Sequence, residues 1–252
     1  SLYSARMDTT IAKGLRMLNR IAQADAPVGV TAMAKEMGLE KSNVHRTLTT
    51  LLTLGYVQRD SATGRYGPTL KVWELGMKVV TRHPMVRAAR PFMQMLHQQT
   101  QETIHLTILD GADCIYLDQI RAPLPVRMTP VPGHRAPAIF PASGRVQLAF
   151  QPNAEEIVSE FRATHPRGKE IKLAATLREF ALIRQQGFTY TESGWSTGIN
   201  SLAGAIIGRD GVSVAALAVS GPAERLTRER MEGLADQVLN ACMQAGDTLR
   251  GT

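Results

Sequence analysis

Three helical periods followed by a short alternating segment, all in the first quarter of the chain, constrain its fold more than any other feature. Apolar residues recur at helical spacing in TTIAKGLRMLNRIAQADAP, in the short segment TAMAKEMG and from Lys41 to about Leu54. The segment GYVQRDSATGRYGP then alternates and turns, which predicts strands at Tyr56–Arg59 and Arg65–Tyr66. Helix, short helix, glycine-containing turn, amphipathic helix and two-stranded ribbon together predict a winged helix-turn-helix.

The ends and inner faces of these helices are also predictable. Thr31 is the expected N-cap of the short helix, and Gly38 is its expected stop. Apolar spacing of three or four residues predicts two inner faces, Ile11, Leu15, Leu18 and Ile21 on the first helix, and Val44, Leu48, Leu51 and Leu52 on the third. These side chains are the expected core of the unit.

The third predicted helix contains no acidic residue. No Asp or Glu lies between Lys41 and Arg59, although the whole chain has 22 of them. A helix in the major groove of DNA lies between two lines of phosphates, which repel carboxylates and attract Lys and Arg. Residues 1–67 also hold nine Lys and Arg against five Asp and Glu, a net charge of +4. We therefore predict that this unit binds double-stranded DNA; a helical bundle with a solvated basic face is the alternative.

Side-chain chemistry predicts how the DNA is contacted. Arg46 can bind guanine bidentately and Asn43 can do so with adenine, at ~1–3 kcal/mol of discrimination per good pair. Phosphate contacts, which position a protein without reading sequence, suit the Lys, Thr and wing Arg side chains. The predicted DNA-contacting residues are Thr31, Lys41, Ser42, Asn43, His45, Arg46, Thr47, Thr49, Thr50 and Arg65.

Composition limits the class of protein. The chain has 252 residues, enough for two domains, and its 44% hydrophobic and 20% charged residues are ordinary for a globular protein. A net charge of +7 favours an anionic partner, whether nucleic acid, an acidic membrane surface or an acidic ligand. Cys114 and Cys242 form neither a zinc motif nor a disulfide framework, so we expect no metal and no cofactor.

Targeting signals are missing from the sequence as given. No apolar run reaches the ~18 residues that a membrane-spanning helix needs. The first ten residues, SLYSARMDTT, lack the apolar core of a signal peptide. We therefore expect a cytoplasmic protein with no membrane partner.

The predicted DNA-binding domain ends near residue 68, and two further parts follow it. Residues 69–83, TLKVWELGMKVVTRH, are expected to form a linker helix whose Trp73 and Leu75 pack against a partner. Pro84 interrupts that pattern, and another amphipathic helix follows Pro91. Residues 84–252 are the expected second domain.

The second domain is predicted to be α+β with an antiparallel sheet. TIHLTILDGADCIYLDQI alternates on both sides of Asp110-Gly111, a strong hairpin signal, and VRMTPV continues as a third strand. Two further strands, GINSLAGAIIG and VSVAALAVSG, meet across Arg209-Asp210-Gly211. The expected helices are Ser143–Phe150, Ala154–Phe161, Thr176–Gln186 and Thr227–Gly246. Neighbouring strand pairs with helices between and around them are typical of α+β domains.

These segments carry a family resemblance that spans about Thr10 to Ala245. VTAMAKEMGLEKSNVHRTLTTLLTLGYVQRDSATGRYGPTLKVWELG resembles the DNA-binding domain of IclR-family transcriptional regulators. LDGADCIYLDQI, PVRMTPVPGHRAP, ASGRVQLAF, IRQQGFTYTESGWSTGINSLAGAI, RDG and ALAVSGP resemble their GAF-like effector-binding domain. The resemblance implies a homodimer or tetramer that binds (pseudo)palindromic operators near catabolic genes, under control of a small-molecule effector.

The resemblance also implies a place for that effector. Family members that take small carboxylates hold them on backbone amides just before a Gly-Lys pair, and those positions are Ala142 and Ser143 here. The other family positions are occupied by Thr191, beside Glu192, where the family has an acid, by Ser201 where it has a cysteine, and by Ala218 and Ser220 where it has serines.

These replacements remove charge and polarity from the predicted pocket. More of its character is then left to Ile139, Phe140, Leu148 and Trp195, for each of which a place in the core or an interface is the alternative. We therefore expect an aromatic acid or a phenol as effector rather than a two-carbon acid. ASGRVQLAF is also similar to the aromatic-catabolism branch of the family.

An enzyme is the main alternative to a regulator. Ser143 in PASGR and Ser220 in VSGP could suggest nucleophiles, which would make the protein a hydrolase with an accessory DNA-binding domain. Neither serine lies in GxSxG, and no Ser/His/Asp arrangement can be proposed. His97 and His105 lie on different predicted elements and suit no metal site. We predict a ligand-responsive regulator without catalytic residues; an architectural DNA-binding protein without a sensor is the third reading.

Overall fold

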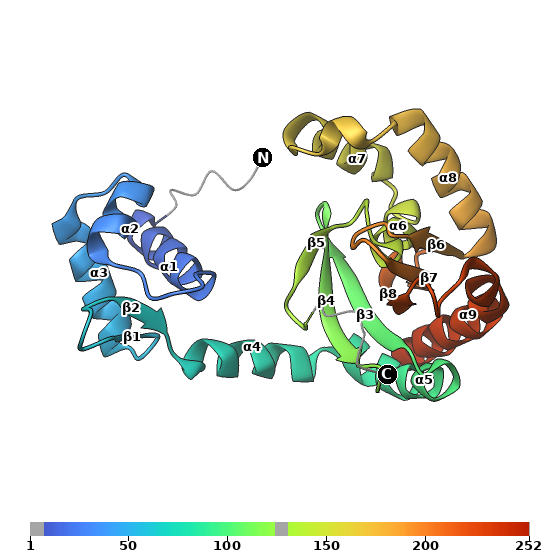
Figure 1. The fold of residues 1–252 in the computed structure, drawn as a ribbon, viewed down its shortest axis with the longest axis horizontal. Coiled ribbons are helices and arrows are strands. Elements are labelled where there is room, and N and C mark those ends of the chain that lie inside the picture. The colour runs from blue at the N-terminus through green and yellow to red at the C-terminus, as the bar shows by residue number, and fades with distance from the viewer. Residues whose placement is uncertain (1–7, 124–130, 252) are drawn as a thin grey trace. The chain divides into compact units, whose positions relative to one another are not determined.

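The computed structural model describes residues 8–123 and 131–251, and the chain separates into two compact units, Ser1–Val80 and Thr81–Thr252. The N-terminal unit contains α1 (Thr9–Ala22), α2 (Val30–Met37), α3 (Lys41–Thr53), β1 (Val57–Arg59), β2 (Tyr66–Pro68) and most of α4 (Leu70–Arg82) (Figure 1). Strands β1 and β2 pair antiparallel as a wing after α3. The predicted winged helix-turn-helix is confirmed.

The N-terminal core forms where the three helices meet the wing. It contains Met17 and Ile21 of α1, Met33 of α2, and Val44 and Leu48 of α3, all nearly inaccessible to solvent. Leu51 of the predicted set is buried as well. The wing closes this core through its Val57 and Tyr66 side chains.

Helix α2 begins two residues earlier than the sequence indicates. Its N-cap is Gly29, so Thr31 lies inside the helix and the prediction of a Thr31 cap is wrong. The reason is a bridge between Val28 and Tyr66 of β2, with N···O distances of 2.8 and 2.9 Å, which keeps the chain extended as far as Val28. At the other end Gly38 takes a left-handed conformation, φ 64°, and ends the helix as predicted.

Several apolar side chains of this unit lie on its surface instead of in its core. Ile11 and Leu15 are 61% and 56% exposed, because α1 turns Met17 and Ile21 inward, and Leu52 of α3 is also exposed. The predicted inner faces were therefore wrong at these three positions. Helix α4 buries none of its residues, although Leu70 and Trp73 are among them.

The C-terminal unit consists of α5 (Pro84–Thr100), β3 (Thr103–Asp110), β4 (Asp113–Ile120), β5 (Arg135–Pro137), α6 (Ala142–Ala149), α7 (Ala154–Thr164), a 3-10 turn (Gly168–Glu170), α8 (Leu173–Gln186), β6 (Phe188–Glu192), β7 (Ile199–Ile207), β8 (Ser213–Pro222) and α9 (Arg228–Gly251). Its six strands form one antiparallel sheet in the order β5-β4-β3-β8-β7-β6 (Figure 1). The predicted α+β class with an antiparallel sheet is confirmed, including the hairpin across Asp110-Gly111.

Some predicted elements of this unit differ from the structure. The expected strand VRMTPV lies outside the described residues except for Val131, and β5 and β6 were not predicted. Helix α5 begins at Pro84, capped by the His83 side chain, and continues through Pro91. A proline suits the first turn of a helix, and buried residues on both sides of Pro91, such as Ala89 and Met93, hold the helix together where one hydrogen bond is lost.

The two faces of the sheet differ in the size of their side chains. One face packs large aliphatic residues, such as Ile104, Leu106 and Leu217, against α5 and α9. The opposite face presents small residues, such as Ala203 and Ala218, toward α6, α7 and α8. None of the helices in the described part of the chain combines the length and hydrophobicity that a membrane span needs.

Candidate functional site

The outward face of α3 is polar and exposed. Ser42, Arg46, Thr49 and Thr50 lie opposite the buried side of the helix and are open to solvent. Lys41 and His45 are also exposed, one step around the helix. Arg46 forms no ion pair within the described residues, so its guanidinium is available to a ligand.

The threonines of this face are tied to their own helix. The Thr49 hydroxyl donates to the His45 carbonyl at 2.9 Å, and the Thr50 hydroxyl donates to the Arg46 carbonyl at 3.2 Å. Each hydroxyl therefore keeps only its acceptor lone pairs for an outside partner. The guanidinium of Arg46 is the strongest hydrogen-bond donor on the face.

Two of the predicted contacts turn away from this face. Lys13 of α1 donates to the Asn43 side-chain carbonyl at 2.7 Å, and both Asn43 and Thr47 are half-buried. Thr47 faces α1 at Gly14 and donates its hydroxyl to the Asn43 backbone carbonyl at 3.0 Å. Bidentate reading of adenine needs the amide carbonyl that Lys13 occupies. The structure therefore places Asn43 and Thr47 between helices and not in the outward row.

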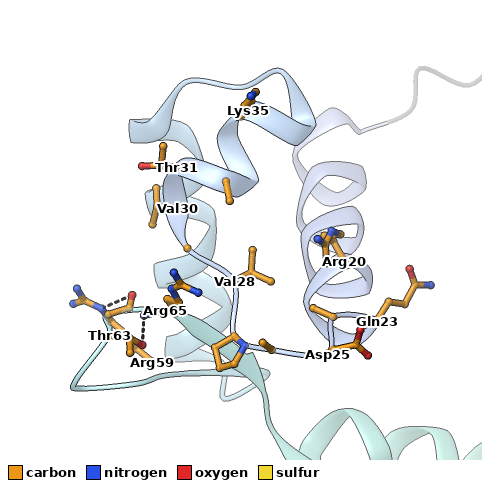
Figure 2. Close-up of a pocket in the computed structure, with 16 residues that line it drawn as sticks. Arg20, Gln23, Asp25, Val28, Val30, Thr31, Lys35, Arg59, Thr63 and Arg65 are labelled. Atoms are coloured by element: carbon orange, nitrogen blue, oxygen red, sulfur yellow. Dashed lines mark hydrogen bonds between the residues drawn. The ribbon is translucent and has the colours of Figure 1, made fainter.

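A basic groove of about 990 Å³ lies between the end of α1, the start of α2 and the wing; Asp25 is the one acid among its described lining residues, against three Arg and one Lys. Figure 2 shows Thr31 and Lys35 on α2 and Arg59 and Arg65 on the wing around this opening, with Arg20 of α1 on its other side. Because the N-cap of α2 is a glycine without a capping side chain, the first amides of this helix have no intrahelical partner. Cationic side chains and free helix amides together favour an anion such as phosphate.

The C-terminal unit holds a small enclosed cavity against the small-residue face of its sheet. Its volume is about 20 Å³, room for about one water molecule. The described residues that line it are His105, Tyr116, Pro141, Ser143, Thr191, Trp195, Ser196, Ile199, Ser201, Ala218 and Ser220. Hydroxyl groups predominate among these side chains, and none of them carries a full charge.

The cavity brings together six of the predicted effector residues: Ser143, Thr191, Trp195, Ser201, Ala218 and Ser220. Ala142 is buried beside them as the first residue of α6, and no side chain caps that helix, so the Ala142 and Ser143 amides lack intrahelical partners. The Ser201 and Ser220 hydroxyls lie 2.9 Å apart across β7 and β8.

Besides Ala142, four other predicted effector residues do not line the cavity. Ile139 and Phe140, just before α6, and Leu148, on α6 itself, are buried in the core, where Phe140 stacks on Trp195 with ring centroids 5.9 Å apart. Glu192 is exposed and pairs with Arg228, because successive residues of β6 point to opposite faces of the sheet. The apolar character of the first three residues and the motif position of Glu192 could not show whether a side chain lines the cavity or lies elsewhere.

His105 and Tyr116 are cavity residues that sequence analysis missed. The His105 side chain is buried, and neither ring nitrogen has a hydrogen-bond partner among the described residues. Its ring meets the Tyr116 ring edge-on, with centroids 5.2 Å apart, and burial lowers the pKa of His105 to about 3. Burial also raises the pKa of Tyr116. The alternation of TIHLTIL was the available signal, since it places His105 on the face opposite Ile104 and Leu106.

Around this cavity, polar contacts fix α6 on the sheet. The Gln147 amide donates to the Thr107 hydroxyl at 3.0 Å and to the Ser143 carbonyl at 2.9 Å. Gly144 is required where the helix passes closest, because a Cβ there would lie 2.2 Å from the Ala138 carbonyl oxygen. Ser143 is thereby held at the cavity wall, 3.5 Å from the Cys114 sulfur.

Both units match known family models. The IclR helix-turn-helix domain matches residues 10–61, and the model described as bacterial transcriptional regulator IclR C-terminal matches residues 77–246. The HTH-type transcriptional regulator KdgR of Dickeya chrysanthemi is 34% identical over 208 residues, which are 80% of this chain and 67% of that protein.

Solved structures share the fold along the whole chain. The IclR of Thermotoga maritima is 26% identical with a TM-score of 0.71, covering 95% of this chain and 98% of that one. An IclR homolog from Microbacterium hydrocarbonoxydans, complexed with 4-hydroxybenzoate, has a TM-score of 0.79 at 20% identity and covers 97% of this chain and 100% of that one.

Proposed function

Because the chain belongs to the IclR family of bacterial DNA-binding transcriptional regulators, we propose that it controls a catabolic operon in response to a small organic acid. In this proposal it acts in the cytoplasm as a homodimer or tetramer on a (pseudo)palindromic operator. The observation that carries the proposal is the exposed, acid-free outer face of α3, with Arg46 at its centre free of ion pairs within the described residues, together with the basic groove of the same unit. The hydrolase alternative has no support, since the matching families and relatives are regulators.

In the proposed complex with DNA, the outward face of α3 and the basic groove make different contacts. Helix α3 enters the major groove and Arg46 reads a base edge, most simply a guanine. The groove with Thr31 and Arg65 takes a backbone phosphate, with the α2 amides and the wing arginines as donors. Lys41, at the start of α3, adds a phosphate contact that reads no sequence.

Exposed apolar side chains support the proposed oligomer. Leu70 and Trp73 of α4 are 74% and 63% exposed, and Met77 follows them at helical spacing. Ile11 and Leu15 of α1 form a second exposed apolar pair in the same unit. Surfaces of this kind mark protein–protein contacts, and a two-fold partner would present two α3 helices to the two halves of a palindrome.

For the effector we propose an organic acid, with an aromatic acid as the first candidate. Its carboxylate would lie at the amides of Ala142 and Ser143, where the N-terminus of α6 favours negative charge. The aromatic rings of Trp195 and Tyr116 line the cavity, and no carboxylate among the described lining residues would repel an anion. The 4-hydroxybenzoate complex of the Microbacterium homolog is consistent with this choice.

An effector of that size requires the cavity to open. Ligand pockets are typically ~300–1,000 Å³, whereas this cavity is about 20 Å³. The segment that carries Trp195 lies between two residues with positive φ, Ser193 at 54° and Gly198 at 75°. We propose that this segment moves Trp195 aside when the effector enters. The effector then changes operator affinity only if it binds the DNA-competent and incompetent arrangements unequally.

The test is binding of the purified full chain to the DNA upstream of its own gene. Binding is compared with a random duplex of equal length at two salt concentrations, with and without benzoate, 4-hydroxybenzoate and phenol. The proposal expects specific binding that weakens steeply with salt and is released or reshaped by at least one compound. Equal affinity for the specific and random duplexes at both salt concentrations would contradict it.

A further inference from the structure

A buried histidine without a hydrogen-bond partner is the least expected feature of the cavity wall. His105 is 1% exposed, and neither Nδ1 nor Nε2 meets a donor or acceptor among residues 8–123 and 131–251. Burying a polar group without a hydrogen-bond partner destabilises the fold. If this position served packing alone, an apolar ring could fill the same space without that cost.

The protonation state of His105 determines what it can recognise. Desolvation lowers the pKa of His105 to about 3, so the imidazole is neutral at physiological pH. A neutral imidazole has one N–H donor and one bare nitrogen acceptor. It therefore offers no charge to a carboxylate, but it can donate to or accept from a hydroxyl group.

The neighbours of His105 leave this capacity unused. Ala218 stands beside it on β8, in the position where family resemblance expects a serine, and its methyl group offers no hydrogen bond. On the same sheet face, the Ser201 and Ser220 hydroxyls lie 2.9 Å from each other, and the Thr107 hydroxyl accepts from the Gln147 amide. Tyr116 presents its ring edge to the imidazole.

We propose that His105 is the specificity-determining residue of the effector cavity and that it holds a hydroxyl group of the ligand. The ligand class is then a hydroxylated organic acid, with its carboxylate at the α6 amides and its hydroxyl at His105. The inference rests on the proposed effector function of this cavity and adds the second polar group of the ligand. His105 and Ser143 line the same small cavity, so one ligand can reach both.

The test compares matched acids that differ by one hydroxyl group. Trp73→Phe leaves Trp195 as the single tryptophan, and its fluorescence then reports binding at the cavity. The probes are 4-hydroxybenzoate against benzoate, and lactate against propionate. The full chain is expected to prefer the hydroxylated member of at least one pair by about tenfold, the value of one good hydrogen bond. Failure to bind or to discriminate either pair overturns the proposal.

Two variants separate recognition from packing. His105→Phe keeps a ring of similar size and is expected to remove the preference while benzoate or propionate still binds. Ala218→Ser places a hydroxyl beside the imidazole and is expected to reduce the preference several-fold, so it serves even if the Phe variant does not fold. An unchanged preference in either folded variant overturns the proposal. Operator binding measured on the same samples separates this outcome from failure of the proposed function. An unchanged preference in the variants, or no preference in the parent chain, contradicts only the role of His105 when operator preference is intact.

Discussion

The polar residues of α3 and those of the cavity wall occupy opposite environments. On the outward face of α3, Ser42, Arg46, Thr49 and Thr50 face solvent, and the folded unit does not depend on what they contact. On β3, β7 and β8 the polar side chains are enclosed, and His105 is enclosed without a partner. Substitutions on the outward face of α3 should therefore change binding and leave stability unchanged, whereas substitutions in the sheet should change stability first.

The largest effect is expected from Leu217→Ala. Leu217 lies next to Ala218 on β8 but points to the other face, into the core with α5 and α9. Removing a fully buried leucine side chain should lower the free energy of unfolding by about 3 kcal/mol. Urea unfolding followed by Trp195 fluorescence in the Trp73→Phe background measures it. The matched control is Val214→Ala on the same strand, which is exposed and should cost under about 1 kcal/mol.

Acidification should destabilise the C-terminal unit through His105. In the unfolded chain this histidine takes up a proton below pH ~6.5, whereas in the folded protein its pKa is about 3. The free energy of unfolding therefore keeps its full value above pH ~6.5 and falls as the pH drops toward 3. Between pH 7 and pH 5 the loss due to His105 is about 2 kcal/mol. Comparing His105→Phe with the parent at both pH values isolates this contribution. An equal loss in both proteins would show that His105 is accessible to protons in the folded state.

Arg46→Ala should weaken specific operator binding by ~1–3 kcal/mol and relax the preference at one base pair of each half-site. Its thermal unfolding should match that of the parent, because Arg46 is exposed. Competition of single-base operator variants against the parent operator measures the preference. An equal loss on specific and random duplexes would show that Arg46 reads no base.

Lys41→Ala provides the contrast on the same helix. It should weaken binding to all duplexes alike and reduce the salt slope by about one, because it removes a phosphate contact. The measurement is the affinity for specific and random duplexes across a series of salt concentrations. A change in base preference with an unchanged slope would reverse the roles of Lys41 and Arg46.

The smallest effect is expected from Asn43→Ala, which breaks the hydrogen bond that Lys13 donates to this side chain. The free energy of unfolding of the N-terminal unit should fall by about 1 kcal/mol, with base preference unchanged. Operator competition and thermal unfolding together measure both quantities. Loss of a preference for adenine at one position would show that Asn43 contacts a base.

The same contrast explains what the sequence could predict. The amphipathic period of α3 separates Val44 and Leu48 from Arg46 within one helix. The exposed face can therefore be predicted from the sequence of that helix alone. The orientation of Asn43 depends on Lys13, thirty residues away, and could not be inferred from that period. For the same reason the sequence cannot exclude Ile11 and Leu15 from the core, since the apolar side of α1 does not reveal which part of it faces its neighbours.

The cavity depends on strand register even more strongly. His105 meets Ala218 only because β3 and β8 pair at that position, across more than a hundred residues of sequence. Alternation showed which residues of β3 share a face but not which face encloses the ligand. Motif position brought Ser143, Ser201 and Ser220 together, whereas the apolar character of Ile139 and Leu148 placed them in the pocket when they lie in the core.

The most direct test of the account is selection of binding sites from a randomised duplex pool by the parent chain and by Arg46→Ala. The account predicts that the parent selects two half-sites related by a two-fold axis, and that the variant loses its preference at one symmetric pair of positions while retaining the rest. Absence of enrichment by the parent, or an identical motif from both proteins, would contradict the claim that the outward face of α3 reads the operator.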